Sequence, residues 1–537
     1  MTTDLTNFSL IYPNETTYIR HRDGEDSPRI DMFVLNELGL LDILDLKNRD
    51  LNEYLTTDAA VIRHRMDVFD DMLACPELAT TLNRLVPILS DILELRRMEA
   101  EYDAGDSYLE SITEIELYIS SVSTLHGGLS PVRSRLKSTA FQTLADRIAE
   151  LAESDYYRDL NAKLAELTAR IRDIRSVTVG VNLDAQLRPT SAGVLSINSQ
   201  PFRSGDVLEK ILRMSFKEDE YTCIADLVPF QKKQNDNQKT ALSLAFHSAI
   251  NDVYKKSLGS WKKIVQSYVL ENTEFLLNLM PEIEFLVRGA DLLARLRDRG
   301  IPLCRPVIAE NAPRFCARDL YNPCVALKVE GEIIPNDIDF CREEALIYVL
   351  TGPNRGGKSV VTCAVGLAQA MMQLGLMVPA KSAEISMADA IYTHFPTGAD
   401  DTIDKGRLGE ECARLRDIFL EVTDRSLVLL DESLSSTGSY EASFIAAEVL
   451  AGLSRVGCRC LFSTHLHELA AEIDRINERT ESEGGAKIDT LVAGIEEGKR
   501  SFKIVRTKPD GRSYARDIAD RYGLSYENIV ENILNQR

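Results

Sequence analysis

The sequence predicts a two-part chain, with a mostly α-helical first half and a second half in which strands and helices alternate around a mainly parallel sheet. Two observations lead to this prediction. Apolar residues recur with a helical period from about residue 50 to 175, and short apolar strands, each followed by a turn and a helix, begin at about residue 305. The 537 residues are enough for three or four domains of about 150 residues each.

The predicted organisation is a leading segment at 1–49, a helical domain at 50–304 and an α/β domain at 305–537. Within the helical domain, a stripe of apolar residues with spacings of 4, 3, 4 and 3 predicts a long packed helix; its members are Leu160, Leu164, Leu167, Ile171 and Ile174. Apolar residues then alternate from Val177 to Leu183, which predicts a strand at the start of a mixed insert at about 176–240. Helical spacing returns at Leu258 and continues to about Arg297.

Charge and composition exclude several classes of protein. A net charge of −21 excludes a simple polycation that coats nucleic acid, although local basic patches remain compatible with it. The apolar runs are far shorter than the ~20 residues that cross a bilayer, and the N-terminus shows no signal peptide. Ten cysteines form no CxxC pair and the seven histidines have no ligand spacing, so we expect reduced thiols, no zinc site, no membrane partner and a cytoplasmic location.

A phosphate-binding loop follows the strand at 346–350. The segment Thr351-Gly352-Pro353-Asn354-Arg355-Gly356-Gly357-Lys358-Ser359 satisfies GxxxxGK[ST], and a helical apolar stretch follows it. Glycines let successive backbone N–H groups converge on phosphate oxygens, and the start of the helix adds positive potential. Lys358 is predicted to contact the β- and γ-phosphates of ATP, and the Ser359 hydroxyl to bind Mg²⁺.

Two further strands end in residues that suit nucleotide hydrolysis. The strand at 426–430 leads into Asp431, predicted to serve Mg²⁺, and Glu432, predicted to orient or deprotonate the attacking water. The strand at 458–464 leads into His465, which would sense the γ-phosphate and help hold that water. The alternatives are a solvated strand end for the acids and a hydrogen-bonded structural role for His465, the role that we favour for His467.

These motifs together resemble the MutS family of ABC-type ATPases. Residues 351–359 are similar to its TGPNxGGKS loop, 429–441 resemble its acid pair and the interface loop that follows, and 463–469 resemble its ATHxxEL block. Weaker similarity covers the FxPNDI segment at 333–338, the elements after Gly511, and the helical region at 50–300. The resemblance implies an α/β P-loop ATPase domain of ABC type joined to a helical lever and core domain with a clamp-like insert. It also implies a homodimer that encloses ATP and Mg²⁺ between two subunits.

The chain departs from the family pattern in several places. We expect the protein to lack the amino-terminal mismatch-recognition domain with its Phe-x-Glu wedge and the Smr nuclease tail. The family's GxSTF signature, whose hydroxyls touch ATP across the dimer, aligns with 406–410, where Leu408 and Gly409 replace the hydroxyl pair. Arg407 or the backbone at Gly409, together with Ser439 of the interface loop, are the candidates for this contact. Ile333 replaces the aromatic residue that would stack on adenine.

The best local candidate for nucleic-acid contact is a basic helix face made of Lys255, Lys256, Lys262 and Lys263. An ordinary solvated helix face is the alternative, and we favour it. Our leading functional hypothesis is an ATP-driven homodimeric clamp on DNA in repair or recombination, not a primary mismatch sensor. The alternatives are a clamp on RNA or ribosomes and a nucleotide-gated assembly protein with little turnover.

Overall fold

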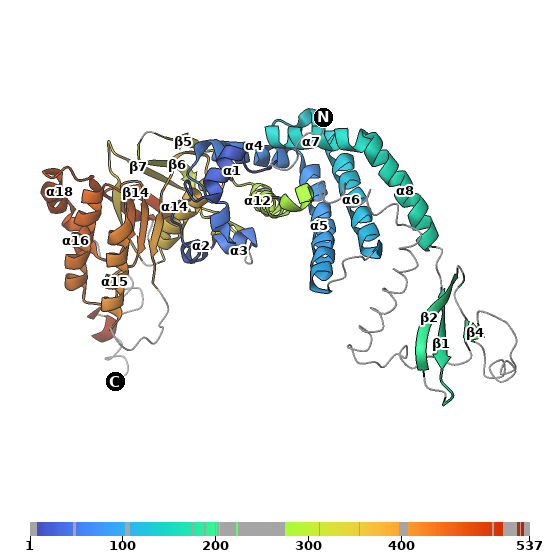
Figure 1. The fold of residues 1–537 in the computed structure, drawn as a ribbon. Helices are drawn as coiled ribbons and strands as arrows, with labels where there is room; N and C mark the ends of the chain where they lie inside the picture. The colour runs from blue at the N-terminus through green and yellow to red at the C-terminus, as the bar shows by residue number, and fades with distance from the viewer. Residues whose placement is uncertain are drawn as a thin grey trace. The chain divides into compact units, whose positions relative to one another are not determined.

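The fold is that of a computed structural model, drawn as a ribbon in Figure 1. It describes residues 8–46, 50–102, 108–172, 176–186, 189–198, 200, 203–204, 222–223, 274–310, 312–353, 355–396, 406–496, 499–508, 524–526 and 528–530. The chain divides into two compact units. We call Met1–Phe8 with Cys75–Glu284 the helical unit, and Ser9–Ala74 with Phe285–Arg537 the α/β unit. The domain boundaries expected after residues 49 and 304 stay a prediction, and the compact units divide the chain at other places.

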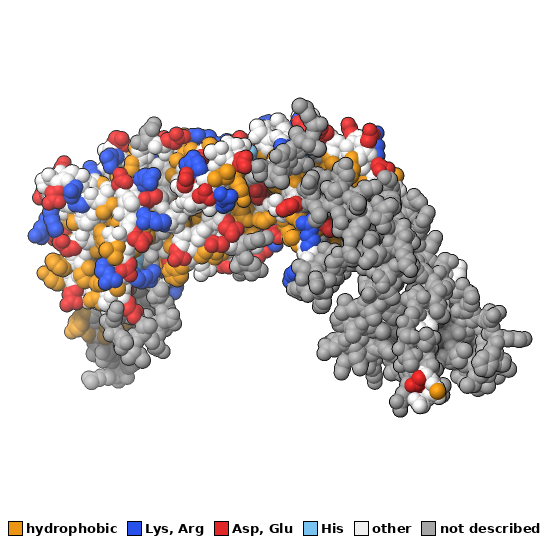
Figure 2. Space-filling view, in the orientation of Figure 1, with side chains coloured by type: hydrophobic (Ala, Val, Ile, Leu, Met, Phe, Trp, Pro, Cys, Tyr) orange, Lys and Arg blue, Asp and Glu red, His pale blue; other side chains and the backbone are white. Residues whose placement is uncertain are grey.

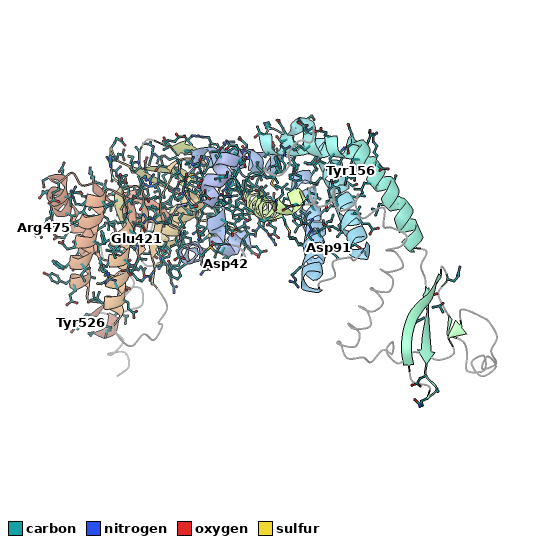
Figure 3. The ribbon with its side chains drawn as sticks, in the orientation of Figure 1. Asp42, Asp91, Tyr156, Glu421, Arg475 and Tyr526 are labelled. Atoms are coloured by element: carbon teal, nitrogen blue, oxygen red, sulfur yellow. The ribbon has the colours of Figure 1, made fainter. Side chains whose placement is uncertain are left out.

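Apolar residues buried at helical spacing hold the helical unit together. Its helices are α5 (Pro76–Tyr102), α6 (Tyr108–Leu129), α7 (Thr139–Glu153) and α8 (Asp155–Arg172), joined in part by the 3₁₀-helix η2 (Ser130–Arg135). Buried residues recur every three or four positions on α5 and on α6, namely Leu78, Leu82, Leu85, Leu89, Ile92, Ile115, Tyr118, Val122, Leu125 and Leu129. The long helix predicted around Leu160 is α8, in which Leu160 and Leu164 are buried. Figure 3 labels Asp91 on α5 and Tyr156 on α8.

A hairpin follows these helices along the chain. Strand β1 (Ser176–Leu183) pairs antiparallel with β2 (Pro189–Asn198), so the strand predicted from alternating valines is confirmed. A short parallel pair, β3 (Arg203–Ser204) and β4 (Thr222–Cys223), follows. The predicted basic helix with Lys255, Lys256, Lys262 and Lys263 lies outside the described residues.

The α/β unit contains two sheets (Figure 1). The larger has the strand order β10 (Ile391–His394), β11 (Leu427–Asp431), β12 (Arg459–Ser463), β8 (Ile347–Thr351), β13 (Ile488–Glu496) and β14 (Lys499–Arg506). Its first five strands are parallel and β14 is antiparallel to β13. The smaller has the order β5 (Val307–Ala309), β9 (Ser382–Ser386), β6 (Arg314–Leu320) and β7 (Asn336–Cys341). The predicted α/β architecture with a mainly parallel sheet is therefore confirmed.

The helices of the α/β unit follow the strands. They are α13 (Pro323–Lys328), α14 (Lys358–Gln373), α15 (Gly406–Glu421), α16 (Ser439–Val456), α17 (His467–Ala471) and α18 (Ile473–Glu481). Strands β8, β11 and β12 are buried along their whole length, which explains why they appear in the sequence as continuous apolar runs. None of the described helices is long and apolar enough to span a membrane. All nine cysteines whose side chains are described are free thiols.

Short elements from the start of the chain belong to the same unit. They are α1 (Glu15–Arg22), α2 (Met32–Glu37), α3 (Leu40–Leu44), the 3₁₀-helix η1 (Leu51–Glu53) and α4 (Ala59–Ala74), and most of α12 (Met280–Asp298) joins them. Leu38 lies directly against α14, since a Cβ added at Gly366 would be 2.7 Å from it. The Thr56 backbone N–H donates to the Gln373 carbonyl at 3.2 Å. These contacts attach the leading segment to the helix that follows the phosphate loop.

A buried arginine joins the two sheets. Arg459, at the start of β12, is fully buried, and burial lowers the pKa of its guanidinium to about 10. It donates to the Gln369 side chain of α14 at 3.0 Å and to the carbonyls of Arg314, Ser386, Met387 and Arg425. Because Arg459 is the first residue of β12, this network fixes the amino end of the strand, opposite the carboxyl end at which Ser463 and His465 lie.

Candidate functional site

Three neighbouring parallel strands bring the predicted motifs to one edge of the larger sheet. In the register of β8, β12 and β11, Leu350 pairs with Ser463 and Ser463 pairs with Asp431. The phosphate loop, the acid pair and His465 each follow the carboxyl end of one of these strands. Crevices at this edge are the usual binding sites of open α/β sheets.

The phosphate loop has a backbone that requires glycine. Gly352 has φ 137° and Gly357, the residue before α14, has φ 94°, both in the region that favours glycine. A Cβ at Gly352 would be 2.7 Å from Ala493, and one at Gly356 would be 2.8 Å from the Pro353 carbonyl oxygen. Arg355 is exposed at φ 58°, and Asn354 lies outside the described residues. Side chains at Gly352 and Gly356 would therefore collide with β13 or with the loop itself.

Lys358 is buried at the base of this loop. Its Nζ donates to the carbonyls of Gly352 and Pro353, each at 3.2 Å, and to His465 Nδ1 at 3.4 Å. Burial lowers the pKa of the Lys358 ammonium, and the nearby Glu432 and Asp431 carboxylates oppose that shift. Ser359, the second residue of α14, is exposed.

Glu432 and His465 form the next link of a polar chain. His465 Nε2 is 2.6 Å from Glu432 Oε1, and since Nδ1 accepts from Lys358, Nε2 carries the proton that it donates to the carboxylate. Glu432 has φ 49°, an uncommon conformation for a non-glycine residue, and its N–H donates to the Ser463 carbonyl at 2.8 Å. This conformation directs the acid from the strand end toward His465. The lysine, the imidazole and the carboxylate thus lie within hydrogen-bond distance of one another in sequence, Lys358 to His465 and His465 to Glu432.

Unsatisfied polar atoms lie on the same edge. Among the described residues, Asp431 Oδ1, Ser463 Oγ and Thr351 Oγ1 are buried and have no hydrogen-bond partner. Buried polar atoms in native proteins are normally paired with protein, water or an ion. A carboxylate and hydroxyls are the oxygen donors that Mg²⁺ prefers, so the donor set at this edge fits a magnesium ion with its waters.

A second strand-end histidine was not predicted. His394, the last residue of β10, is buried, and its Nδ1 is 2.7 Å from Ser433 Oγ, which donates to the His394 carbonyl at 3.2 Å. Burial and, to a smaller extent, the charge of Arg414 lower the pKa of His394 to about 4. The pair fastens the turn that begins with Glu432. Its position at the end of an apolar strand was the available sequence signal, but its partner, the serine after the acid pair, carries no recognisable pattern.

The residues predicted for the contact across the dimer lie on α15 and α16. Leu408 packs against the core formed by β8, β11, β12 and α16, whereas Gly409 is exposed. Ser439 is exposed at the start of α16, and the Arg407 side chain is outside the described part of the chain. The His467 side chain is likewise not described. On the face drawn in Figure 2, basic and acidic side chains of the α/β unit are interspersed.

Two family models match the chain. Residues 348–525 match the model described as MutS domain V, and residues 57–299 match the model described as the MutS2 N-terminal domain. The first match contains the phosphate loop, the acid pair and His465, and the second contains most of the described part of the helical unit.

Curated relatives are similar to part of the chain. The DNA mismatch repair protein spellchecker 1 of Drosophila melanogaster is 37% identical over 196 residues, which are 36% of this chain and 21% of that protein. The DNA mismatch repair protein MutS of Chloroflexus aurantiacus is 35% identical over 218 residues, 39% of this chain and 21% of that protein. The MutS protein of Clostridium kluyveri is 34% identical over 242 residues, 43% of this chain and 26% of that protein. The matched region thus spans about a fifth to a quarter of these relatives' length.

Proposed function

The chain belongs to the MutS family, with a MutS domain V ATPase and a MutS2-type N-terminal domain, and from this premise we propose that it is an ATP-driven homodimeric clamp on DNA. We propose a role in repair or recombination, and not in primary mismatch sensing. The observation that carries the ATPase assignment is the polar chain from Lys358 through His465 to Glu432 at the phosphate loop.

Each residue of this chain has a task in hydrolysis. Lys358 would transfer its hydrogen bonds from the loop carbonyls to the β- and γ-phosphate oxygens. Glu432 would accept a proton from the attacking water. At the same time the water oxygen would form a bond to the γ-phosphorus, and the bond from that phosphorus to the ADP oxygen would break. His465 holds the Glu432 carboxylate at 2.6 Å and so orients it. Ser359 and Asp431 would hold Mg²⁺, which supplies charge neutralisation of the phosphates.

Two substitutions test this assignment in the full chain. Lys358→Ala removes the charge at the phosphates, so we expect ATP binding to fall below detection by calorimetry. Glu432→Gln keeps the size of the side chain but removes the base, so we expect retained ATP binding and a loss of about 100-fold or more in turnover. Unaltered ATP affinity in Lys358→Ala would refute the assignment of the loop. Wild-type hydrolysis in Glu432→Gln would mean that another group activates the water.

The proposal of a DNA clamp rests on the family match in the helical unit and on the relatives, which are DNA mismatch repair proteins. ATP would be enclosed by two copies of the chain, with Arg407, Gly409 and Ser439 as candidates for contacts to the partner's nucleotide. Lys255, Lys256, Lys262 and Lys263 remain the candidates for phosphate contacts along DNA.

A nucleotide-gated assembly protein with little turnover is the second candidate, and one observation favours it. Leu408, which replaces a hydroxyl of the family signature, is partly buried against the core and has no hydrogen-bonding group to offer ATP. If this candidate is correct, Glu432→Gln will leave an already slow rate of hydrolysis unchanged while ATP still alters the oligomeric state. A large drop in rate rejects it.

A further inference from the structure

The turn that follows β11 and carries Glu432 has a strained backbone. Glu432 has φ 49°, and Leu434, two residues later, has φ 64°, both in the left-handed region that residues other than glycine rarely adopt. Leu434 is buried in the same apolar cluster as residues of β11 and α16, so its backbone cannot relax without moving a core side chain. Strained residues persist only where the surrounding structure holds them, and they cluster at functional sites.

Ser433, between these two residues, is held by the end of the neighbouring strand. It is buried, and its hydroxyl donates to the His394 carbonyl at 3.2 Å. Burial lowers the pKa of His394 to about 4, so at neutral pH the ring is uncharged and has a single N–H. Because the hydroxyl proton of Ser433 is directed to the carbonyl, we assign the ring proton to Nδ1, which donates to Ser433 Oγ at 2.7 Å. Two hydrogen bonds therefore join this serine to one histidine.

His394 has a fixed place of its own. It is the last residue of β10 and pairs with Leu430 of β11, and the preceding residue, Thr393, donates to Glu37 of α2 at 2.5 Å. Its other ring nitrogen, Nε2, is buried and has no hydrogen-bond partner among the described residues. An apolar side chain at this position would leave no polar atom unpaired. The histidine must therefore bring a benefit that offsets this cost, and its bond to the strained turn is the one that the structure shows.

We propose that His394 and Ser433 are positioning residues for Glu432. This inference rests on the proposed ATP hydrolysis and adds two residues that act through the catalytic acid and not on the nucleotide. Their hydrogen bonds hold the turn in the conformation in which the Glu432 carboxylate lies 2.6 Å from His465. Without them the turn relaxes, and the carboxylate leaves the place where it accepts a proton from water. The phosphate loop belongs to another strand end and keeps its affinity for ATP.

The first test separates turnover from nucleotide binding. The kcat for ATP hydrolysis and the dissociation constant of Mg-ATP are measured on the full chain for the wild type, His394→Ala, Ser433→Ala and His394→Asn. The two alanine variants should lower kcat about 10- to 100-fold and leave the dissociation constant within about twofold of wild type. The amide N–H of His394→Asn takes the place of Nδ1–H, so this variant should keep kcat within about twofold. Unchanged kcat in Ser433→Ala overturns the positioning role.

A second test asks whether the effect passes through the acid. In the Glu432→Gln background, adding His394→Ala or Ser433→Ala should not slow the residual hydrolysis further, because the group that they position is no longer a base. Single-turnover hydrolysis of radiolabelled ATP measures these slow rates. A second loss of the same size in this background would show that the two residues act independently of Glu432, and would overturn the proposal.

His64→Ala is the matched control for the loss of a buried histidine. His64 of α4 lies in the same unit, burial lowers its pKa, and its Nε2 donates to the Leu10 carbonyl at 3.2 Å. This variant should unfold at a lower temperature and keep the wild-type kcat. A fall in kcat as large as that of His394→Ala would mean that lost stability, and not the position of the acid, explains both.

Two further outcomes keep the proposal apart from the function on which it rests. Circular dichroism shows which variants are folded, and if His394→Ala is not, Ser433→Ala carries the test, since it removes only one oxygen atom. If the wild-type chain hydrolyses no ATP, the proposed function itself fails. If the wild type hydrolyses ATP and Glu432→Gln does not, but Ser433→Ala is as fast as wild type, only the positioning role is lost.

Discussion

His394 is a buried neutral side chain whose titration links the stability of the α/β unit to pH. Burial and Arg414 lower its pKa to about 4, and its ring is fastened to Ser433, next to the proposed catalytic acid Glu432. In the unfolded chain a histidine titrates near its ordinary value of about 6.5. Below about pH 6.5 the unfolded state therefore binds a proton that the folded state does not bind. The free energy of unfolding decreases as the pH falls, until the pH reaches the pKa of the folded state.

We predict that the free energy of unfolding changes more steeply with pH in the wild-type chain than in His394→Asn. From about pH 7 to about pH 5, His394 should remove about 2 kcal/mol from the free energy of unfolding of the wild-type α/β unit. His394→Asn should lack this component, because an amide does not titrate. Urea unfolding followed by circular dichroism at several pH values measures both curves. If the two free energies change in parallel with pH, His394 is not the source of the linkage.

The sequence predicted those residues of the site that lie in contiguous motifs. Glu432 follows β11 directly, His465 lies two residues after β12, and Lys358 follows β8 after the phosphate loop. Parallel neighbours place these strand ends at one edge, where the structure brings the three side chains within hydrogen-bond distance. His394 was not predicted. Its role depends on Ser433, which lies in the turn after β11, and such a partner leaves no periodic signal in the sequence.

At the level of elements, helices α5 and α6 approach closely at one of two adjacent glycines. A Cβ added at Gly128 would overlap Thr81 of α5, closer than any real Cβ contact, whereas a Cβ at Gly127 would meet nothing within 4 Å. Both glycines lie in the last turn of the same helix and differ only in the direction they face. Gly128 therefore permits the helix contact, and Gly127 only adds flexibility to the unfolded chain.

This contrast predicts opposite effects of one substitution. Gly127→Ala should stabilise the helical unit by about 0.5–1 kcal/mol, since alanine favours helix and nothing obstructs it. Gly128→Ala should destabilise it by about 1–3 kcal/mol through overpacking, and Thr81→Ala in the same chain should recover part of the loss. Thermal unfolding of the four proteins measures these differences. Equal effects of the two alanines would contradict the close packing of α5 and α6.

Helices and strands with a regular apolar pattern in the sequence were predicted, and short elements without such a pattern were not. The buried strands β8, β11 and β12, the valine-rich β1 and the helix α8 have clear periods and appear where the sequence predicted them. The attachment of Ser9–Ala74 to the α/β unit was not foreseen. Its early elements α1, α2 and α3 have five to eight residues each, too few for a periodic pattern, and their place is set by contacts with α14 such as that of Leu38.

For the whole molecule, the main question is which partner the ATPase responds to. The net charge of −21 opposes association with any polyanion, and on the face drawn in Figure 2 the described basic side chains are mixed with acidic ones. A nucleic-acid clamp of this composition must therefore bind through a restricted basic surface, and its affinity must fall steeply with salt. The proposed dimer encloses ATP between two copies of the chain. A second requirement is therefore that the dimer forms only while ATP stays bound.

The last prediction joins these two requirements. Glu432→Gln retains ATP but does not hydrolyse it, so with Mg-ATP it should remain dimeric in light scattering, whereas Lys358→Ala should stay in the nucleotide-free state. Wild-type ATPase should rise severalfold with one class of ligand among homoduplex, mismatched and branched DNA, single strands, structured RNA and ribosomes, and this rise should disappear at high salt. Stimulation by branched or duplex DNA supports the proposed clamp, and preferential stimulation by RNA or ribosomes replaces DNA as its partner. Slow turnover that no ligand changes, with ATP-dependent dimerisation intact, would instead establish the nucleotide-gated assembly protein, because ATP would then control association without a polymer to act on.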